Sequence, residues 1–344
     1  MDADLTRAER LLHVDAHAFD RAPFADEVGG RLAALFYSGR PLDRRVAPMP
    51  LAVTTRSDGA HAWSGTGVVL GPAAHDERVE IADRCLCLRV VLHGGTVTGV
   101  VVRDLGTGTE AEVGARAVVV AADALRTPQL LHASGVRPPA LGRYLNDQPQ
   151  VVFAVRSPDE VVAAHRAVTG RTRDTDGAIV PRSGVSWVPC TDEQPFHGQV
   201  TQLDASPVPL TDDTDIEPGA VVGLAGSAPR TSRPRTVSIR RLRTDPYGLP
   251  APRIHYRYTD RDLAAMKRAK KAVAEAGAAL GVPLDDSRVL LAAGSSLHYQ
   301  GTTRMGPADD ATSVCDDHSR VRNTRGLWVA GTTSSPRPPP AMRP

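Results

Sequence analysis

One stretch decides the fold of this chain: VVVAADALRTPQLLHASG, residues 118–135. Its first five residues are apolar at every position, and a strand that is apolar on both faces is usual in a parallel sheet covered by helices. The rest predicts a helix from about Thr127 to Ser134, with Pro128 in its first turn and Gly135 as its C-terminal cap. The stretch therefore indicates a strand, Val113–Ala122, that leads directly into a helix.

Short apolar or alternating runs on both sides of this stretch predict further strands. They lie at Val79–Ile81, Cys85–Leu92, Thr96–Asp104, Val151–Val155, Ala220–Leu224, Thr236–Leu242 and Leu327–Ala330. Gly94-Gly95 and Gly106-Thr107-Gly108 stand where hairpin turns are needed. Polar stretches rich in proline and arginine separate the strands of the middle region, so we expect an antiparallel sheet there.

Helical periodicity appears near the N-terminus and late in the chain. Leu5, Ala8, Leu11 and Leu12 share one face of a short helix, and a second helix is expected at about Asp26–Phe36 in spite of Gly29-Gly30. The longest helix is expected at Asp260–Leu280. Its apolar stripe comprises Leu263, Met266, Ala269, Val273, Ala276 and Leu280.

The composition limits the classes of partner. The 344 residues include 41 Lys and Arg against 39 Asp and Glu, a formal net charge of +2, and 4% aromatic residues. This balance argues against a nucleic-acid or membrane-surface partner. No apolar run approaches the ~20 residues of a membrane span, and the polar N-terminus lacks a signal-peptide pattern, so we expect a cytoplasmic protein. The four cysteines form no CxxC pair and indicate neither a zinc site nor a disulfide framework.

The longest ordered series of motifs lies near the C-terminus. It comprises HYQGTTRMG at residues 298–306, TSVCD at 312–316, SRV at 319–321 and GLWVAG at 326–331. This series resembles the C-terminal signature of glucose–methanol–choline (GMC) oxidoreductases, H-x-x-G-T-x-x-M-G, then V-D-x-x-x-R-V, then G-L-x-V, with Cys315 in place of a valine. Its details look most like the bacterial pyranose oxidase and glycoside 3-oxidase branch.

Three other segments share the resemblance. Residues 118–135 are similar to the family's strand–turn–helix that closes over the flavin, with Asp123 where the family commonly has glycine. LGRYLND, residues 141–147, is similar to L-G-x-x-L-x-D-H, with Gln148 in place of the histidine. The stretch from Asp245 to Tyr256 is a weaker match, to D-x-x-G-x-P-x-I-x-Y.

The resemblance implies a reaction and its site residues. The family removes a proton from an alcohol and passes hydride to N5 of FAD, so His298 is the expected base, because imidazole titrates near neutral pH. Thr302 and Arg304 would contact the cofactor or hold His298, whereas Asp316, Ser319 and Arg320 would fix their loop. The expected cofactor-binding residues are Ala122, Thr127, Pro128, Thr302 and Gly331. The expected substrate is a small alcohol, sugar or glycoside.

The resemblance also implies an α/β (α+β) fold that combines an incomplete FAD-binding Rossmann-like domain with an antiparallel-sheet substrate domain. The expected organisation is a helical or loop segment at 1–60, part of the FAD-binding domain at 61–150, the substrate-binding domain at 151–290, a return to the FAD-binding domain at 291–331, and a proline-rich tail at 332–344.

Two pieces of the family pattern are missing. No strand leads through G-x-G-x-x-G into a helix; Gly106–Ala111 fits G-x-G-x-x-A but lies between two expected strands and predicts a hairpin turn. PRPPPAMRP ends the chain in place of an N-P-T-like segment. We therefore expect an internal start at Met1 and a frameshift after about Ser334. The alternatives are a non-catalytic remnant and a half-enzyme subunit completed by a separate N-terminal chain.

Overall fold

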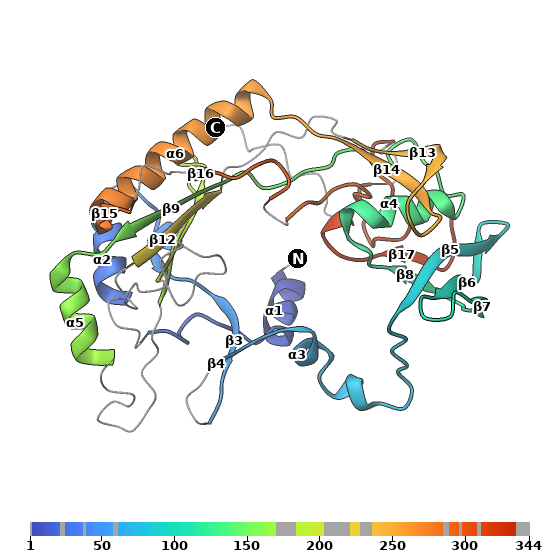
Figure 1. The fold of residues 1–344 in the computed structure, drawn as a ribbon, viewed down its shortest axis with the longest axis horizontal. Helices are drawn as coiled ribbons and strands as arrows, with labels where there is room; N and C mark the ends of the chain where they lie inside the picture. Colours follow the sequence, from blue (N-terminus) through green and yellow to red (C-terminus); the bar gives the residue numbers. More distant parts are fainter. Residues whose placement is uncertain are drawn as a thin grey trace. The chain divides into compact units, whose positions relative to one another are not determined.

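The computed structural model describes residues 2–20, 25–36, 39–57, 61–169, 184–202, 221–227, 236–284, 289–295, 298–307 and 311–334. The chain forms two compact units (Figure 1). Unit 1 comprises Met1–Glu80, Pro149–Pro229 and Asp262–Leu291, and unit 2 comprises Ile81–Gln148, Arg230–Arg261 and Ala292–Pro344. The proline-rich stretch 336–344 lies outside the described residues.

Unit 1 is built on an antiparallel sheet with the strand order β15-β9-β12-β11-β10-β2, and β16 also pairs with β9. These strands are β2 (Ala47–Pro48), β9 (Gln150–Arg156), β10 (Val185–Val188), β11 (His197–Gln202), β12 (Val221–Ser227), β15 (Val282–Pro283) and β16 (Val289–Leu290). The antiparallel sheet expected for the middle region is therefore confirmed.

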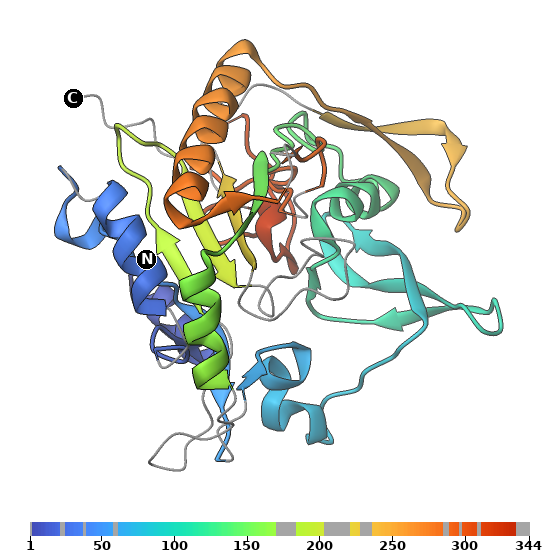
Figure 2. The same cartoon turned by 60° about the vertical axis from the view of Figure 1, so that its left-hand side comes forward.

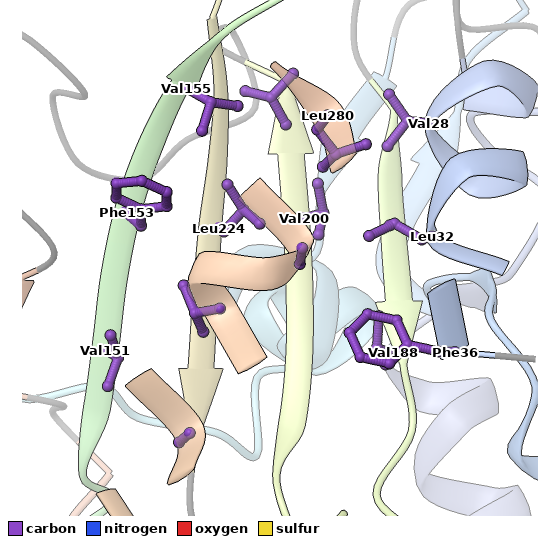
Figure 3. Packing of buried hydrophobic residues seen from close by; sticks show 14 of the residues in the cluster. Val28, Leu32, Phe36, Val151, Phe153, Val155, Val188, Val200, Leu224 and Leu280 are labelled. Carbon is purple, nitrogen blue, oxygen red and sulfur yellow. The ribbon is translucent and has the colours of Figure 1, made fainter. Parts of the chain in front are cut away.

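Two helices cover one face of this sheet, α2 (Ala25–Phe36) and α6 (Asp260–Leu280) (Figures 1 and 2). Figure 3 shows the core between these helices and the sheet, in which Leu32 and Val155 are 0% exposed. Helix α6 approaches β9 closely at Gly277, where a Cβ atom would lie 2.4 Å from the Phe153 ring.

The remaining elements of unit 1 are short. A three-stranded sheet has the order β1-β3-β4. The elements are α1 (Asp2–Leu11), β1 (Val14–Asp15), η1 (Leu42–Arg44), β3 (Leu51–Thr55), β4 (His61–Trp63), α3 (Thr66–Leu70), η2 (Gly71–His75) and α5 (Asp159–Thr169). Within the described ranges, none of the helices combines the length and the apolar character that a membrane span requires.

Unit 2 contains an antiparallel meander, a hairpin and a parallel pair of strands. The meander has the order β5-β6-β7, the hairpin is β13-β14, and the parallel pair is β17-β8. The elements are β5 (Cys85–His93), β6 (Thr96–Asp104), β7 (Glu110–Gly114), β8 (Val118–Val120), α4 (Asp123–Ala133), β13 (Thr236–Thr244), β14 (Pro250–His255), β17 (Leu327–Val329) and η4 (Thr332–Ser334). The mixture of helices with mainly antiparallel sheet confirms the predicted α+β class.

Four details of the sequence prediction are wrong. The expected strand Val113–Ala122 is divided between β7 and β8, because β7 pairs with β6 and β8 pairs with β17. Val119 is 60% exposed, so β8 is not buried on both faces. Val79–Ile81 forms no strand and exposes its two apolar side chains. In α6, Leu263 is 49% exposed while Asp262 is 1% exposed, so the buried stripe excludes Leu263.

Candidate functional site

The parallel pair β8–β17 fixes the position of the candidate site within unit 2. The strands pair in register from Leu327 with Val118 to Val329 with Val120, and the ladder continues with a 2.9 Å bond from the Ala330 N–H to the Val120 carbonyl. Both carboxyl ends therefore lie at the same edge. In open α/β sheets, ligands bind outside the carboxyl ends of the strands. Here the residues that follow the two strands are small: Ala121, Ala122, Ala330 and Gly331.

Helix α4 begins at Asp123, after the two alanines that follow β8, and Asp123 has a φ of 58°. Aspartate tolerates this left-handed conformation better than most residues, which is consistent with its standing where the family commonly has glycine. The Asp123 carboxylate accepts hydrogen bonds from the N–H groups of Leu125 (2.5 Å) and Arg126 (3.0 Å). Its own side chain therefore caps the first turn and occupies amides that a phosphate would otherwise use.

Pro128 lies inside α4 and not in its first turn, because the helix begins four residues before Thr127. Proline has no N–H, so the Ala124 carbonyl loses its partner within the helix. The Thr302 hydroxyl replaces that donor at 2.6 Å. The Thr127 hydroxyl accepts a 3.2 Å bond from the Ala122 N–H. Both threonines are 0% exposed, and their hydroxyls bond to the backbone around the helix start. The C-terminal cap at Gly135, with a φ of 80°, is confirmed.

Residues 298–305, which carry most of the His298 motif and are called the 298–305 segment, run along the turn that follows β17. Three backbone N–H···O bonds join them: Gly301 to Thr332 (3.2 Å), Thr303 to Thr333 (3.0 Å) and Met305 to Ser334 (3.0 Å). A further bond of 3.1 Å runs from the Thr332 hydroxyl to the Tyr299 carbonyl. His298 is exposed and directly precedes Tyr299. His298 therefore stands at the start of a segment that hydrogen bonds hold beside the residues following Gly331.

The LGRYLND motif holds the same segment from another side. Gly142 donates its N–H to the Thr302 carbonyl at 2.9 Å and accepts the Val237 N–H at 2.6 Å. Its φ is 73°, and a Cβ atom would lie 2.1 Å from the Val237 carbonyl oxygen, so glycine is required here. Asn146 and Gln300 exchange both backbone bonds, at 2.9 and 2.7 Å.

Arg304, within the motif, is buried. Its guanidinium lies 3.7 Å from the centre of the Tyr144 ring, and its Nε donates to the Thr312 carbonyl at 2.8 Å. A guanidinium over an aromatic face is a favourable cation–π arrangement. Since Arg304 is 5% exposed, this geometry favours a role in holding the motif.

Asp316 organises the loop before β17, as the sequence predicts. Its carboxylate accepts the N–H groups of His318 (3.0 Å) and Arg320 (2.9 Å) and the Nε of Arg320 (3.0 Å). Burial alone would raise the pKa of Asp316, but the hydrogen bonds from Arg320 and His318, with the Arg320 charge, lower it below its usual range. The carboxylate is therefore held ionised and fixes the loop.

Asp245 ties the β13–β14 hairpin to α4. Its carboxylate accepts two backbone N–H groups of its own turn and two side-chain donors from α4, Arg126 and Gln129. Burial would raise the pKa of Asp245, but the hydrogen bonds from Gln129, Leu249, Tyr247 and Arg126 together lower it. The weakly matched D-P-Y-G-L-P stretch thus supports the helix that begins at the candidate site.

The structure gathers the predicted cofactor residues around the start of α4 and the end of β17. Ala122 and Gly331 are each the second residue after the end of a strand, whereas Thr127, Pro128 and Thr302 are buried. The sequence alone does not single out Thr333, which is 0% exposed in η4 and bonds to Thr302. The sequence predicts a tail at residues 332–344, but Thr332–Ser334 form η4. The two threonines directly after Gly331, which differ from the proline-rich stretch that follows, are the signal that could have separated them from the tail.

The resemblance places the ribityl chain or pyrophosphate of a flavin beside Gly331, and the structure leaves space there. A Cβ atom on Gly331, whose φ is 96°, would meet no atom within 4 Å, so space is open beside its backbone. The expected hairpin turn at Gly106–Ala111 is confirmed by the antiparallel pairing of β6 with β7, so it is not a pyrophosphate-binding turn.

Two segments match the family models described as GMC oxidoreductase, residues 51–150 and 231–342. The chain belongs to the GMC oxidoreductase family. The predicted resemblance is therefore confirmed, and both halves of the candidate site, from β8 to Asp147 and from His298 to η4, lie within the matched segments.

This GMC oxidoreductase chain is 50% identical over 331 residues to the C-glycoside 3-oxidase of Arthrobacter globiformis, covering 95% of this chain and 62% of the relative. It is 30% identical over 364 residues to the pyranose 2-oxidase of Tricholoma matsutake, covering 97% and 63%. The chain thus spans under two thirds of the length of these relatives. Among solved structures, formate oxidase matches with a TM-score of 0.64 and 17% identity, over 92% of this chain and 67% of that chain, which supports the fold.

Proposed function

We propose that this GMC oxidoreductase chain serves in FAD-dependent oxidation of a CH–OH group of a sugar or glycoside, with His298 as the base. The observation that carries the proposal is its 50% identity over 331 residues to a C-glycoside 3-oxidase. The family models match both the strand–turn–helix around Ala122 and the His298 segment. The geometry adds support, because hydrogen bonds hold these segments together.

Each predicted residue has a distinct task in this proposal. His298, exposed at the end of the 298–305 segment, would accept the hydroxyl proton of the substrate. Gly331 and Ala122 would lie against FAD, since they follow the carboxyl ends of β17 and β8. Thr127 and Thr302 would hold the backbone of that surface, because their hydroxyls bond to it. FAD, when bound, supplies the hydride acceptor.

A second candidate function is that of a subunit completed by another polypeptide. Val119 favours it, because this valine is 60% exposed on a parallel pair of strands. Parallel strands are usually covered on both faces by other elements. A complementing polypeptide that contains a flavin pyrophosphate-binding turn would cover this valine and complete the cofactor site. The third candidate, a remnant without catalysis, predicts that the chain binds no flavin, whether alone or with an added polypeptide.

The first experiment is to incubate the purified chain with FAD, desalt it and record the visible absorption spectrum. Oxidation of glucose and of a C-glycoside is then followed with a dye as electron acceptor. The same measurements are repeated after adding the part of the Arthrobacter globiformis relative that this chain does not match. Flavin retained by the chain alone supports the first candidate, flavin retained only with the added polypeptide supports the second, and a colourless chain in both cases supports the third.

His298→Gln tests the role of the base in whichever preparation is active. Removing a general base costs about 10²- to 10⁴-fold in rate, so we expect kcat to fall at least 100-fold while flavin is retained. His318→Gln is the matched control, because His318 lies in the same unit and its side chain is 86% exposed. Unchanged kcat in His298→Gln would show that another group takes the proton.

A further inference from the structure

Three buried threonine hydroxyls form one continuous chain in unit 2. Thr302 Oγ1 lies 2.6 Å from the Ala124 carbonyl oxygen and 2.8 Å from Thr333 Oγ1, and Thr333 Oγ1 lies 2.7 Å from Thr303 Oγ1. Thr302, Thr303 and Thr333 are each 0% exposed. Buried hydroxyls of this kind are polarised by one another, so that each bond strengthens the next.

The chemistry of the carbonyl fixes the direction of every proton in the chain. A carbonyl oxygen only accepts, so Thr302 donates its single proton to Ala124. Thr302 then has no proton left, and Thr333 must donate to Thr302. The single proton of Thr333 is then committed to Thr302, so Thr303 must donate to Thr333. The protons therefore run from Thr303 through Thr333 and Thr302 to the carbonyl that Pro128 leaves without a helical partner.

We propose that Thr333 is a positioning residue for His298, acting through this ordered hydroxyl chain. The functional part of this inference rests on the proposed role of His298 as the base. Thr333 stands in η4, two residues after Gly331, and binds the two threonines of the 298–305 segment. Its hydroxyl thus adds a side-chain link to the backbone bonds that hold the segment beginning at His298 against the backbone that follows β17.

The chain also connects this segment to α4. Without the Thr302 donor, the Ala124 carbonyl would be left unpaired in a buried turn, which native structures avoid. The start of α4, the 298–305 segment and η4 consequently depend on one set of hydroxyls. A sequence with Pro128 in this helix needs a donor from outside it, and Thr302 provides that donor.

The test uses the chain without flavin and two measurements. The first is amide hydrogen exchange in α4, and the second is the NMR signal of the His298 ring, assigned by its loss in His298→Gln. Thr333→Val keeps the shape of the side chain and removes the hydroxyl, while Thr333→Ser keeps the hydroxyl. Thr324→Val is the matched control, because the Thr324 hydroxyl donates to the Val321 carbonyl at 2.7 Å outside the chain of three.

We expect Thr333→Val to accelerate exchange in α4 about tenfold, because an unsatisfied buried hydrogen-bonding group is costly. It should also shift the His298 signal, and Thr333→Ser should restore both readouts. Thr302→Val should accelerate exchange most, since it leaves the Ala124 carbonyl and the Thr333 proton unpaired. Thr303→Val should accelerate exchange least, since it removes only the first donor. Thr324→Val should leave the His298 signal in place.

Several results would overturn the inference. An unmoved His298 signal in Thr333→Val would remove the positioning role, and equal effects of Thr303→Val and Thr302→Val would contradict the proton order. If Thr333→Val does not fold, Thr303→Val against Thr303→Ser makes the same comparison at the donor end. None of these readouts needs flavin or turnover. A chain that fails to retain FAD on its own would therefore refute the first candidate function without deciding the role of Thr333.

Discussion

Replacing Asp245 by asparagine tests how firmly the β13–β14 turn is bound to α4. The Asp245 side chain is 8% exposed. One carboxylate oxygen accepts the N–H groups of Tyr247 (2.9 Å) and Leu249 (3.0 Å), and the other accepts Arg126 (2.8 Å) and Gln129 (2.9 Å). An amide has one oxygen, so one pair of donors must face an NH₂ group in either orientation of the new side chain.

The size of the effect follows from these contacts. Arg126 is 48% exposed, so its ion pair contributes at most about 1 kcal/mol. Gln129 is 1% exposed, and a hydrogen bond from such a group to an ionised acceptor contributes about 1.5–3 kcal/mol. We therefore expect Asp245→Asn to lower the free energy of unfolding of unit 2 by about 2–4 kcal/mol at pH 7.

The assay needs a signal from unit 2 alone. The chain has three tryptophans, and Trp328 is the one in unit 2, so unfolding in guanidinium chloride is followed by its fluorescence in a Trp63→Phe, Trp187→Phe background. Asp104→Asn is the matched control. Asp104 caps the β6–β7 turn in the same way, through the N–H groups of Gly106 (2.7 Å) and Thr107, but it is exposed. Its replacement should cost much less.

The pH dependence follows from the lowered pKa of Asp245. The folded pKa lies below the unfolded value of about 3.9, so the stabilisation is complete above that value and is lost as pH falls through the folded pKa. The difference between the wild-type chain and Asp245→Asn should therefore be constant from neutral pH down to about pH 5 and shrink below about pH 4. Equal destabilisation by Asp245→Asn and Asp104→Asn, or a difference independent of pH, would refute this account.

Two further predictions concern glycine conformation and thiol reactivity. Gly142→Ala should lower the free energy of unfolding by more than about 4 kcal/mol, because its Cβ atom meets the Val237 carbonyl. Gly135→Ala, in open space at φ 80°, should lower it by about 1–2 kcal/mol. Similar unfolding midpoints of the two variants in guanidinium chloride would contradict this. Burial, and next the neighbouring carboxylate of Asp316, raise the pKa of Cys315 to about 12. At pH 8, mass spectrometry should find an alkylating reagent on the exposed Cys85 and not on Cys315 in the folded chain.

Elements decided by local pattern could be predicted from the sequence. Helix α6 occupies the expected span Asp260–Leu280, because its apolar residues keep a helical period over 21 residues. Strand β6 likewise occupies Thr96–Asp104, since Gly94-Gly95 supplies a turn with two positive φ angles and fixes where the hairpin begins. The His298 motif could be recognised for a related reason, because its glycines and small polar residues have a characteristic spacing.

Elements decided by a distant partner could not be predicted in the same way. The run Val113–Ala122 is apolar except at Gly114 and Arg116. Its first part pairs with β6 and its last part with β17, more than 200 residues away in the sequence. The break, Ala115–Ala117, holds the charged residue of the run, Arg116, but the pairing partner of each part is set by distant strands. Val119 was expected to be buried because apolar residues favour burial, but its exposure is decided by what covers the strand pair.

Helix α4 shows most directly how a distant residue can change a local prediction. A proline normally marks the first turn of a helix, so Pro128 placed the expected start at about Thr127. Two other residues move that start to Asp123. The aspartate adopts a positive φ and caps its own helix, and Thr302, 174 positions further along (302 − 128), donates the hydrogen bond that the proline cannot. The proline and the threonine are therefore a matched pair. A chain that kept Pro128 and lost the Thr302 hydroxyl would be expected to lose the first turn of α4, and with it the position of Ala122 beside Gly331.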